Sequence, residues 1–218
     1  MPDIKLYYCE CTNPDCRFRF PTPSEKTTIR YCPKCGWELE AIQLKKTGQN
    51  YLPSQSFDNS PVVEALLDNI RSAYNVGSIF RSADGAGLRR LHLCGITPTP
   101  ENPSIAKTSL GAENSVPWSS HLNAVRTVKE IKQTGFRILA LETSARSCSF
   151  FKIVDVFQAN PTLLIVGNEV SGVDPAVLEL CDAIAWIPMQ GMKESLNVSI
   201  AFGIAAYTLR FSSQIRAD

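Results

Sequence analysis

The chain has 218 residues with 22 basic and 21 acidic side chains, so its formal net charge at pH 7 is +1. This length allows one substantial core, or a core with a small satellite module, because a domain above roughly 150 residues buries about 70% of its unfolded surface. The charge balance gives no global attraction to nucleic acid, so any RNA contact must rely on local basic patches. No apolar run approaches ~18 residues and the N-terminus lacks a signal-peptide core, which predicts a cytoplasmic protein without a membrane segment.

The first 40 residues contain most of the chain's eight cysteines. Disulfides are rare in the cytoplasm, so clustered cysteines there favour a metal site. CPKCG, at residues 32–36, has the spacing of a zinc knuckle, and a second pair of thiols is needed to close a tetrahedron. Cys11 and Cys16 supply that pair, with Cys9 as an alternative to Cys11. We predict a zinc-ribbon-like module over residues 1–40 that holds a structural Zn through Cys11, Cys16, Cys32 and Cys35; the alternative is buried or free thiols.

Cations and aromatic rings are interleaved beside these cysteines. They are Arg17, Phe18, Arg19, Phe20, Arg30 and Tyr31. Such a mixture suits base stacking and phosphate contact on single-stranded or looped RNA. The alternative is that the rings only form the small core of the module. Residues 41–57 are polar and show no sustained period, which predicts a linker.

From residue 58 to residue 218, short β-like runs alternate with helical patterns. The runs are VVEALL, RLHLCGI, RILALE, TLLIVG and AIAWIP, and the predicted helices cover residues 76–86, 121–134, 175–181 and 196–211. This alternation predicts an α/β fold with a parallel sheet covered by helices. His92 falls inside a predicted strand and His121 at a predicted helix start, so we expect both to serve packing or capping.

Three segments carry unusual polar and glycine residues. YNVGSIFRSADGAG, Tyr74 to Gly87, has glycines whose spacing fits neither the dinucleotide nor the P-loop fingerprint. LLIVGNEVSGV places Glu169 in a glycine loop after a buried-strand pattern, where open parallel sheets bind ligands. IPMQGMKESLNVSIAFGIAAY places Ser195 and Asn197 at the opening of a helix. Taken singly, that last pattern is typical of a helix N-cap.

Together these segments resemble the three motifs of the SpoU/TrmH family of RNA 2′-O-ribose methyltransferases, in the SPOUT superfamily. The resemblance covers residues 58–212, with NIRSAYNVGSIFRSADGAG, IVGNEVSGV and IPMQGMKESLNVSIAFGIA in that order. It implies a SPOUT-type parallel sheet with a deep C-terminal trefoil knot, bound S-adenosylmethionine (AdoMet), and RNA instead of DNA as substrate. It also implies a homodimer that buries Phe202, Ala206 and Tyr207 against a second subunit. The zinc module is not the usual N-terminal extension of this family, which leaves the RNA target open.

The resemblance also implies a set of site residues. The family's cofactor positions fall on Thr143, Gly167, Glu169, Ile187, Met189, Gly191, Ser195 and Leu196. Its polar catalytic positions fall on Asn75, Arg81, Glu169, Ser195 and Asn197. A guanidinium has a pKa above about 12 and rarely gives up its proton. We therefore expect Arg81 to hold a phosphate and stabilise the developing alkoxide, not to act as the base.

The implied function is AdoMet-dependent 2′-O-methylation of a ribose in tRNA or rRNA. One alternative is a catalytically idle RNA-binding or ribosome-assembly factor on the same scaffold, but the intact polar set speaks against it. A second alternative is methylation of an RNA base. Arg81 and the run Ser195-Leu196-Asn197 favour the ribose.

Overall fold

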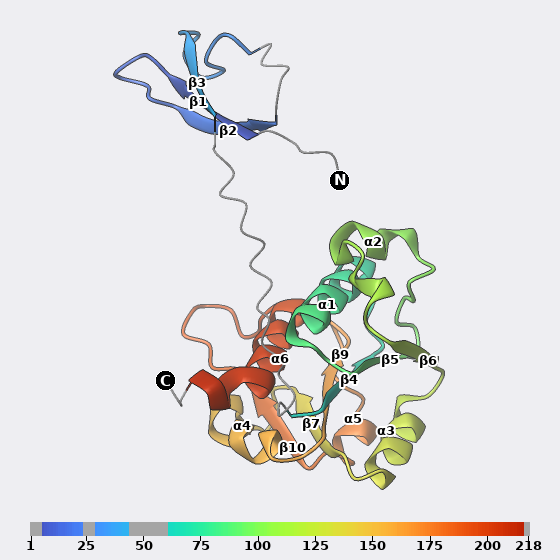
Figure 1. Cartoon of the computed structure of the whole chain (residues 1–218). Helices are drawn as coiled ribbons and strands as arrows, with labels where there is room; N and C mark the ends of the chain where they lie inside the picture. The colour runs from blue at the N-terminus through green and yellow to red at the C-terminus, as the bar shows by residue number, and fades with distance from the viewer. Residues whose placement is uncertain (1–5, 24–28, 44–60, 216–218) are drawn as a thin grey trace. The chain divides into compact units, whose positions relative to one another are not determined.

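The computed structural model describes residues 6–23, 29–43 and 61–215. The chain divides into two compact units, Met1–Ser56 and Phe57–Asp218. In the first unit, strand β1 (Leu6–Cys11) lies between β2 (Arg19–Pro23) and β3 (Leu39–Gln43), and both pairings are antiparallel (Figure 1). The sheet therefore continues past residue 40. Residues 44–57 of the predicted linker lie outside the described residues.

The second unit is built on one parallel sheet. Its strands are β4 (Val63–Asp68), β5 (Arg90–Cys94), β6 (Trp118–His121), β7 (Arg137–Leu141), β8 (Cys148–Ser149), β9 (Thr162–Gly167) and β10 (Ala183–Trp186). They lie in the order β6-β5-β4-β9-β7-β10-β8, and every neighbouring pair is parallel. This confirms the predicted α/β class. The trefoil knot stays a prediction, because strand order does not establish it.

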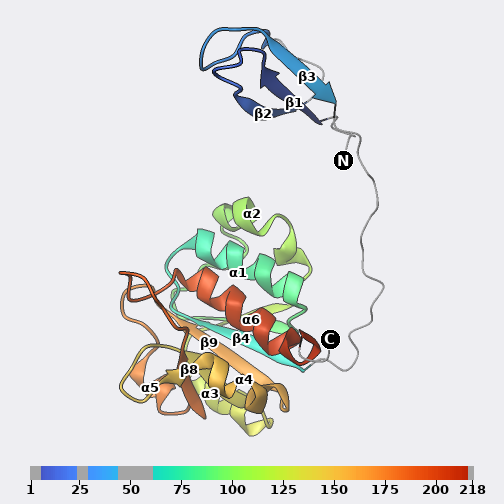
Figure 2. The same ribbon diagram turned by 90° about the vertical axis from the view of Figure 1, so that its left-hand side faces the viewer.

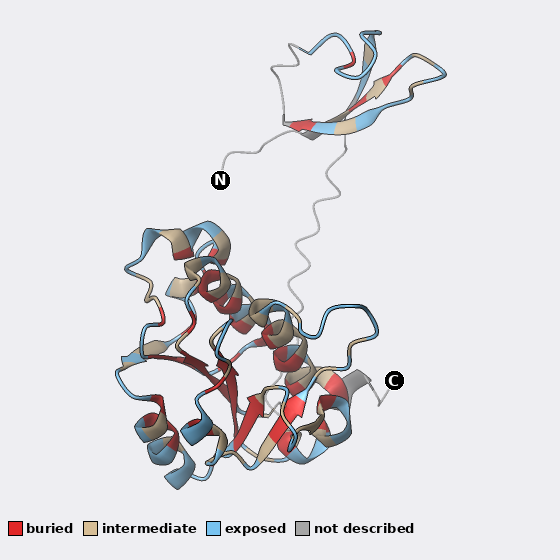
Figure 3. Cartoon of the chain, turned by 180° about the vertical axis from the view of Figure 1, so that it is seen from behind, coloured by how far each residue is buried: buried red, intermediate tan, exposed pale blue. Residues whose placement is uncertain are grey.

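Helices cover both faces of this sheet. They are α1 (Ala73–Ala86), α2 (Pro103–Ser109), the short 3-10 helix η1 (Ala112–Asn114), α3 (Ala124–Gln133), α4 (Phe150–Gln158), α5 (Pro175–Leu178) and α6 (Val198–Ile215). Side chains of α1, α4 and α6 join one buried cluster, and those of α3 and α5 join the other. Figure 2 shows α1 and α6 side by side over the sheet, and Figure 3 shows the central strands buried between the layers. None of the described helices is long and apolar enough to cross a membrane.

The glycines of the first motif serve helix packing. α1 begins after Ser72, whose side chain accepts the Asn75 N–H, and ends at Gly87, which has the left-handed φ of 65° common at a helix C-terminus. A Cβ on Gly77 would overlap the α2 backbone, and a Cβ on Gly85 would overlap the Tyr207 hydroxyl of α6. Both glycines therefore allow neighbouring helices to approach α1 closely.

Two expectations about this unit are wrong. His121 is the last residue of strand β6, and α3 starts only at Ala124, because the Asn123 side chain caps that helix by accepting the Arg126 N–H. Phe202 and Ala206 are fully buried in the chain's own core, so neither can pack against a second subunit. Tyr207 remains 46% exposed.

A polar cluster lies on strands β4, β5 and β6. The Glu64 carboxylate accepts hydrogen bonds from Arg89 Nε (2.6 Å) and His92 Nε2 (2.8 Å), and His92 Nδ1 lies 3.2 Å from His121 Nε2. Burial would raise the pKa of Glu64, but its partners His92 and Arg89 hold it below the ordinary value. Burial, followed by the proximity of His92, lowers the pKa of His121.

We predict that His121 makes the folded state less stable in mild acid than at neutral pH. Because the folded state depresses the pKa of His121, its contribution is present above the unfolded pKa near 6.5 and is lost as pH falls through the folded value. The free energy of unfolding of the full chain should drop between pH 7 and pH 5, by at most about 1.4 kcal/mol per pH unit for one histidine. In His121→Gln that drop should be smaller, as denaturant titrations at both pH values would measure. Equal drops in both proteins would contradict the assignment.

Candidate active site

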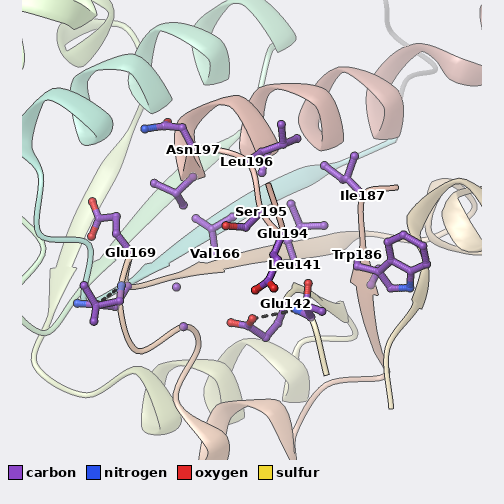
Figure 4. A pocket seen from close by; sticks show the side chains of 18 residues that line it. Leu141, Glu142, Val166, Glu169, Trp186, Ile187, Glu194, Ser195, Leu196 and Asn197 are labelled. Atoms are coloured by element: carbon purple, nitrogen blue, oxygen red, sulfur yellow. Dashed lines mark hydrogen bonds between the residues drawn. The ribbon is translucent and has the colours of Figure 1, made fainter. Parts of the chain in front are cut away.

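A cavity of the second unit lies at the carboxyl ends of β7, β9 and β10, among the described residues. Its volume is about 510 Å³, and Figure 4 shows the side chains that surround it. It is lined by Leu141, Glu142, Thr143, Val166, Gly167, Asn168, Glu169, Val170, Gly172, Ala185, Trp186, Ile187, Glu194, Ser195, Leu196, Asn197, Val198 and Ala201. Open parallel sheets bind ligands outside the carboxyl ends of their strands. The second and third motifs therefore meet where a ligand is expected.

The loop of the second motif folds back tightly on its own strand. The backbones of Asn168 and Gly172 exchange hydrogen bonds of 3.0 and 2.9 Å. A Cβ on Gly167 would overlap Gly172, and Gly172 itself has φ +72° and packs against the Glu142 carboxylate. Glu142 also accepts the N–H of Val173 (2.9 Å). Gly167 is required because a side chain would not fit there. Gly172 is required both for lack of space and because its backbone has a positive φ.

Glu169 connects this loop to the start of α1. Its carboxylate accepts the backbone N–H groups of Arg71 (2.9 Å) and Ser72 (3.2 Å) and the side-chain amide of Asn75 (2.8 Å). Partial burial would raise the pKa of Glu169, but these hydrogen bonds outweigh it and lower the pKa. A negative charge is also favoured beside a helix N-terminus. The carboxylate is therefore held in its charged form at pH 7.

Asn75 passes this connection on to the third motif. Its Oδ1 accepts the Asn197 amide at 3.1 Å, and the Asn197 Oδ1 accepts the Ser199 N–H (2.9 Å) at the start of α6. A carboxylate can only accept and a backbone N–H can only donate, so the two ends of the chain of hydrogen bonds fix the orientation of both amides. One network thus joins all three motifs and caps two helices.

The structure brings most of the predicted cofactor residues to one cavity. Thr143, Gly167, Glu169, Ile187, Ser195 and Leu196 line it. Met189 and Gly191 lie in the loop between β10 and α6 but do not line the cavity. Several other residues line the cavity that were not predicted from sequence, among them Leu141, Glu142, Trp186 and Val198. Leu141 and Glu142 could have been predicted, because they end the β-like run RILALE and ligands of open parallel sheets bind at the carboxyl ends of strands.

The predicted catalytic residues are only partly assembled. Asn75, Glu169 and Asn197 are joined by hydrogen bonds, and Ser195 lines the cavity beside them. Arg81 is exposed on α1 and forms no hydrogen bond or ion pair with another described residue. It follows Asn75 by six residues, which places the two side chains about 120° apart around the helix. Arg81 is therefore free to meet a ligand outside the cavity.

The cavity fits a nucleoside with a charged tail. Leu141, Ile187 and Leu196 provide apolar surface suited to a purine ring. The backbone N–H groups of residues 194–196, which line the cavity, have no hydrogen-bond partner among the described residues, so they are available to a ligand. No lysine, arginine or histidine lines the cavity, whereas three glutamates do. The donor set accordingly suits a cationic ligand and not a nucleotide phosphate.

The first unit contains a second candidate site. The Sγ atoms of Cys11, Cys16, Cys32 and Cys35 all lie within 4.8 Å of one another, and Cys9 is outside this group. Gly36 has φ +75° and donates its N–H to the Cys32 carbonyl, which gives the knuckle its turn. Burial would raise the pKa of Cys32, but backbone N–H groups, first that of Lys34, lower it to about 7. Four converging cysteine sulfurs are the donor set of a tetrahedral zinc site.

Comparisons with known proteins agree with the site. The model of the SpoU rRNA Methylase family matches residues 63–207. A tRNA (guanosine(18)-2′-O)-methyltransferase of Aquifex aeolicus is 35% identical over 142 residues, which are 65% of this chain and 65% of that protein.

Solved structures of SpoU-type methyltransferases have the same fold as the second unit. The A. aeolicus TrmH/SpoU tRNA modifying enzyme superposes with a TM-score of 0.64 at 29% identity, over 74% of this chain and 81% of that one. The methyltransferase AviRb from Streptomyces viridochromogenes, in complex with the cofactor AdoMet, has the same fold, with a TM-score of 0.64 at 24% identity over 84% and 71% of the two chains. The chain spans 57% to 66% of the lengths of three curated relatives that it matches. Because the family model covers most of the chain, the protein belongs to the SpoU rRNA methylase family.

Proposed function

We propose that this protein transfers a methyl group from AdoMet to the 2′-hydroxyl of a ribose in tRNA or rRNA. The observation that carries the proposal is the hydrogen-bonded chain Glu169–Asn75–Asn197, which joins the three motifs at the edge of the cavity. The names of the similar proteins support it, since one denotes a tRNA 2′-O-methyltransferase and another structure holds AdoMet.

The chain's own residues would hold the cofactor in the cavity. Ile187 and Leu196 would contact the adenine, and the free N–H groups of residues 194–196 would form hydrogen bonds with its edge. Thr143, Gly167 and Ser195 line the remaining wall. When bound, AdoMet supplies a methyl group on a positively charged sulfur.

The polar residues position the reaction. Three N–H donors already occupy the Glu169 carboxylate and its pKa is lowered, so it is a weak base and acts as a positioning residue. Asn75 and Asn197, held in fixed orientations, would align the ribose, and alignment alone can supply a large part of a rate enhancement. Arg81 would bind the adjacent phosphate and stabilise the alkoxide that forms as the hydroxyl loses its proton.

A map of ribose methylation tests the proposal. RNA from cells with and without the gene should differ at one or a few 2′-O-methyl nucleotides, and the wild-type gene should restore them. A difference confined to methylated bases would favour base methylation. Identical maps together with altered ribosome assembly would favour the idle RNA-binding factor.

For the first unit, we propose a structural zinc ion held by Cys11, Cys16, Cys32 and Cys35. A site with four protein ligands leaves no open position, which fits folding and not catalysis. The same unit exposes Tyr31 (60%) and Trp37 (55%), so it would offer stacking surfaces to RNA. A homodimer and a cytoplasmic location stay predictions. If the protein is a dimer, the exposed Ile200 and Tyr207 of α6 are candidates for its interface.

The zinc proposal predicts one zinc ion per chain in the purified, reduced protein. Cys32→Ser should release the ion and unfold the first unit while the second unit keeps its thermal transition, because the two units are separately compact. Cys9→Ser is the matched control and should keep the metal, since Cys9 lies outside the cluster. Elemental analysis measures both, and metal-free wild-type protein would contradict the proposal.

Replacing Arg81 with lysine should separate binding from transfer. Lysine keeps the charge but lacks the planar fork that binds phosphate with two hydrogen bonds. Cofactor affinity should survive, because Arg81 does not line the cavity. Methyl transfer should fall on the order of a hundredfold, the cost of one preorganised donor at an oxyanion. Single-turnover rates with the RNA identified by mapping measure this, and an unchanged rate would make Arg81 an ordinary surface residue.

Glu169→Gln should weaken the hydrogen bonds that connect the second motif to the start of α1. Glutamine offers one carbonyl oxygen where the carboxylate accepts three N–H donors, so at least one donor loses its partner. We expect the free energy of unfolding to fall by about 1–2 kcal/mol, as for the loss of a helix cap. Glu179→Gln, at an exposed residue that forms an ion pair with Arg146, is the control and should change the free energy of unfolding by less than about 0.5 kcal/mol. Equal effects in denaturant titrations would contradict the role of Glu169.

A further inference from the structure

The cavity carries more negative charge than the binding of an adenosine requires. Glu142, Glu169 and Glu194 line it, and no basic side chain does. Lys193 precedes Glu194 in the chain but is not part of the lining. Hydrogen bonds to the α1 N-terminus occupy Glu169, which leaves Glu142 and Glu194 as charges without an assigned task.

Glu142 is a fixed charge. Its two carboxylate oxygens accept the N–H groups of Thr143 and Val173, both at 2.9 Å, and its side chain packs against Gly172. Neither hydrogen bond comes from a cation, so the negative charge stays uncompensated beside the cavity. Figure 4 shows the Glu142 side chain among those that line the cavity.

Glu194 is a second negative charge, and no contact with another described residue holds its side chain in place. It is exposed, precedes Ser195 in the loop before α6, and forms no hydrogen bond or ion pair with another described residue. It also lines the cavity (Figure 4), so its carboxylate faces the same space as that of Glu142. Substitution at this exposed position should not disturb the fold.

We propose that Glu142 and Glu194 form an anionic subsite that makes the cavity favour the positively charged methyl donor over its neutral product, S-adenosylhomocysteine. The inference rests on the proposed function. Methyl transfer breaks the bond between sulfur and the methyl carbon, leaves the electron pair on sulfur, forms an oxygen–carbon bond and releases the hydroxyl proton. The ligand's net charge thereby falls from +1 to zero.

The physical basis is that a carboxylate attracts only the charged form of an otherwise similar ligand. Donor and product share the adenosine and the amino acid tail, so their contacts with Ile187, Leu196 and the loop amides are alike. The difference in affinity therefore reports the field at the sulfur. This field would help to expel the product, since the attraction ends when the methyl group leaves.

Calorimetry on the full chain with three ligands tests the subsite. These are AdoMet, S-adenosylhomocysteine, and sinefungin, which places a protonated amine where AdoMet has the sulfonium. The wild type should bind both cations more tightly than the product, and added salt should reduce the preference. Glu194→Gln should lower this preference about threefold, the order expected for the loss of one solvent-screened charge beside a cation, and leave affinity for the product unchanged.

A matched variant and a second site complete the test. Glu130→Gln makes the same change in net charge on the exposed face of α3, where Glu130 pairs with Arg126, and should leave the preference intact. Glu142→Gln should lower the preference as Glu194→Gln does. Equal affinity of the wild type for all three ligands, or an equal loss for all three in Glu194→Gln, would overturn the subsite while leaving the proposed function in place. Failure of all three to bind the wild type would overturn both.

Discussion

The arrangement of the second unit depends on one chain of hydrogen bonds, from Glu169 through Asn75 to Asn197. Glu169 lies 94 positions and Asn197 lies 122 positions after Asn75 in the sequence. Their side chains meet because β4, β9 and β10 all end at one edge of the sheet. Each end of the network satisfies N–H groups at the start of a helix, which otherwise lack partners. The polar residues that define the site are therefore also those that fix where α1 and α6 begin.

The glycines of α1 show a second constraint, which is distance between helices. A glycine inside a helix costs about 1 kcal/mol relative to alanine, so two of them in α1 need a compensating benefit. Gly77 lets the α2 backbone approach, and Gly85 makes room for the Tyr207 hydroxyl of α6. A glycine-rich segment directly after a strand is therefore no sign of a phosphate site by itself. Here it sets the spacing of the helical layer that covers the sheet.

Sequence patterns predicted the buried strands well, because β9 (TLLIVG) is apolar over most of its length and β4 (VEALLD) contains the apolar run from Ala65 to Leu67. They failed for β6, WSSH, a polar edge strand with one neighbour, and so misplaced His121. They also failed for α4, FFKIVDVFQ, whose apolar run fits strand or helix equally well.

For the site too, local sequence patterns predicted some residues correctly, whereas others depend on contacts between distant parts of the chain. The resemblance placed Glu169 and Leu196 at the cavity, but only the fold shows that Met189 and Gly191 are not part of its lining. Spacing alone favoured Cys11 but left Cys9 as an alternative ligand, whereas the structure places Cys11 in the cysteine cluster and Cys9 outside it. Phe202 illustrates the reverse error, because an apolar residue on a terminal helix looks the same whether it is buried within one chain or between two.

Charge divides the unit into two regions with different tasks. The cavity is lined by carboxylates and would repel the phosphates of an RNA backbone, so the polyanion cannot be held there. The net charge of +1 gives no compensating attraction over the whole surface. Under the proposed function, RNA would be bound by individual cations outside the cavity, and Arg71 and Arg81 are exposed and close in sequence to Asn75. The separation would keep the cationic donor and the anionic acceptor on opposite sides of that chain, so that only the reacting groups have to meet.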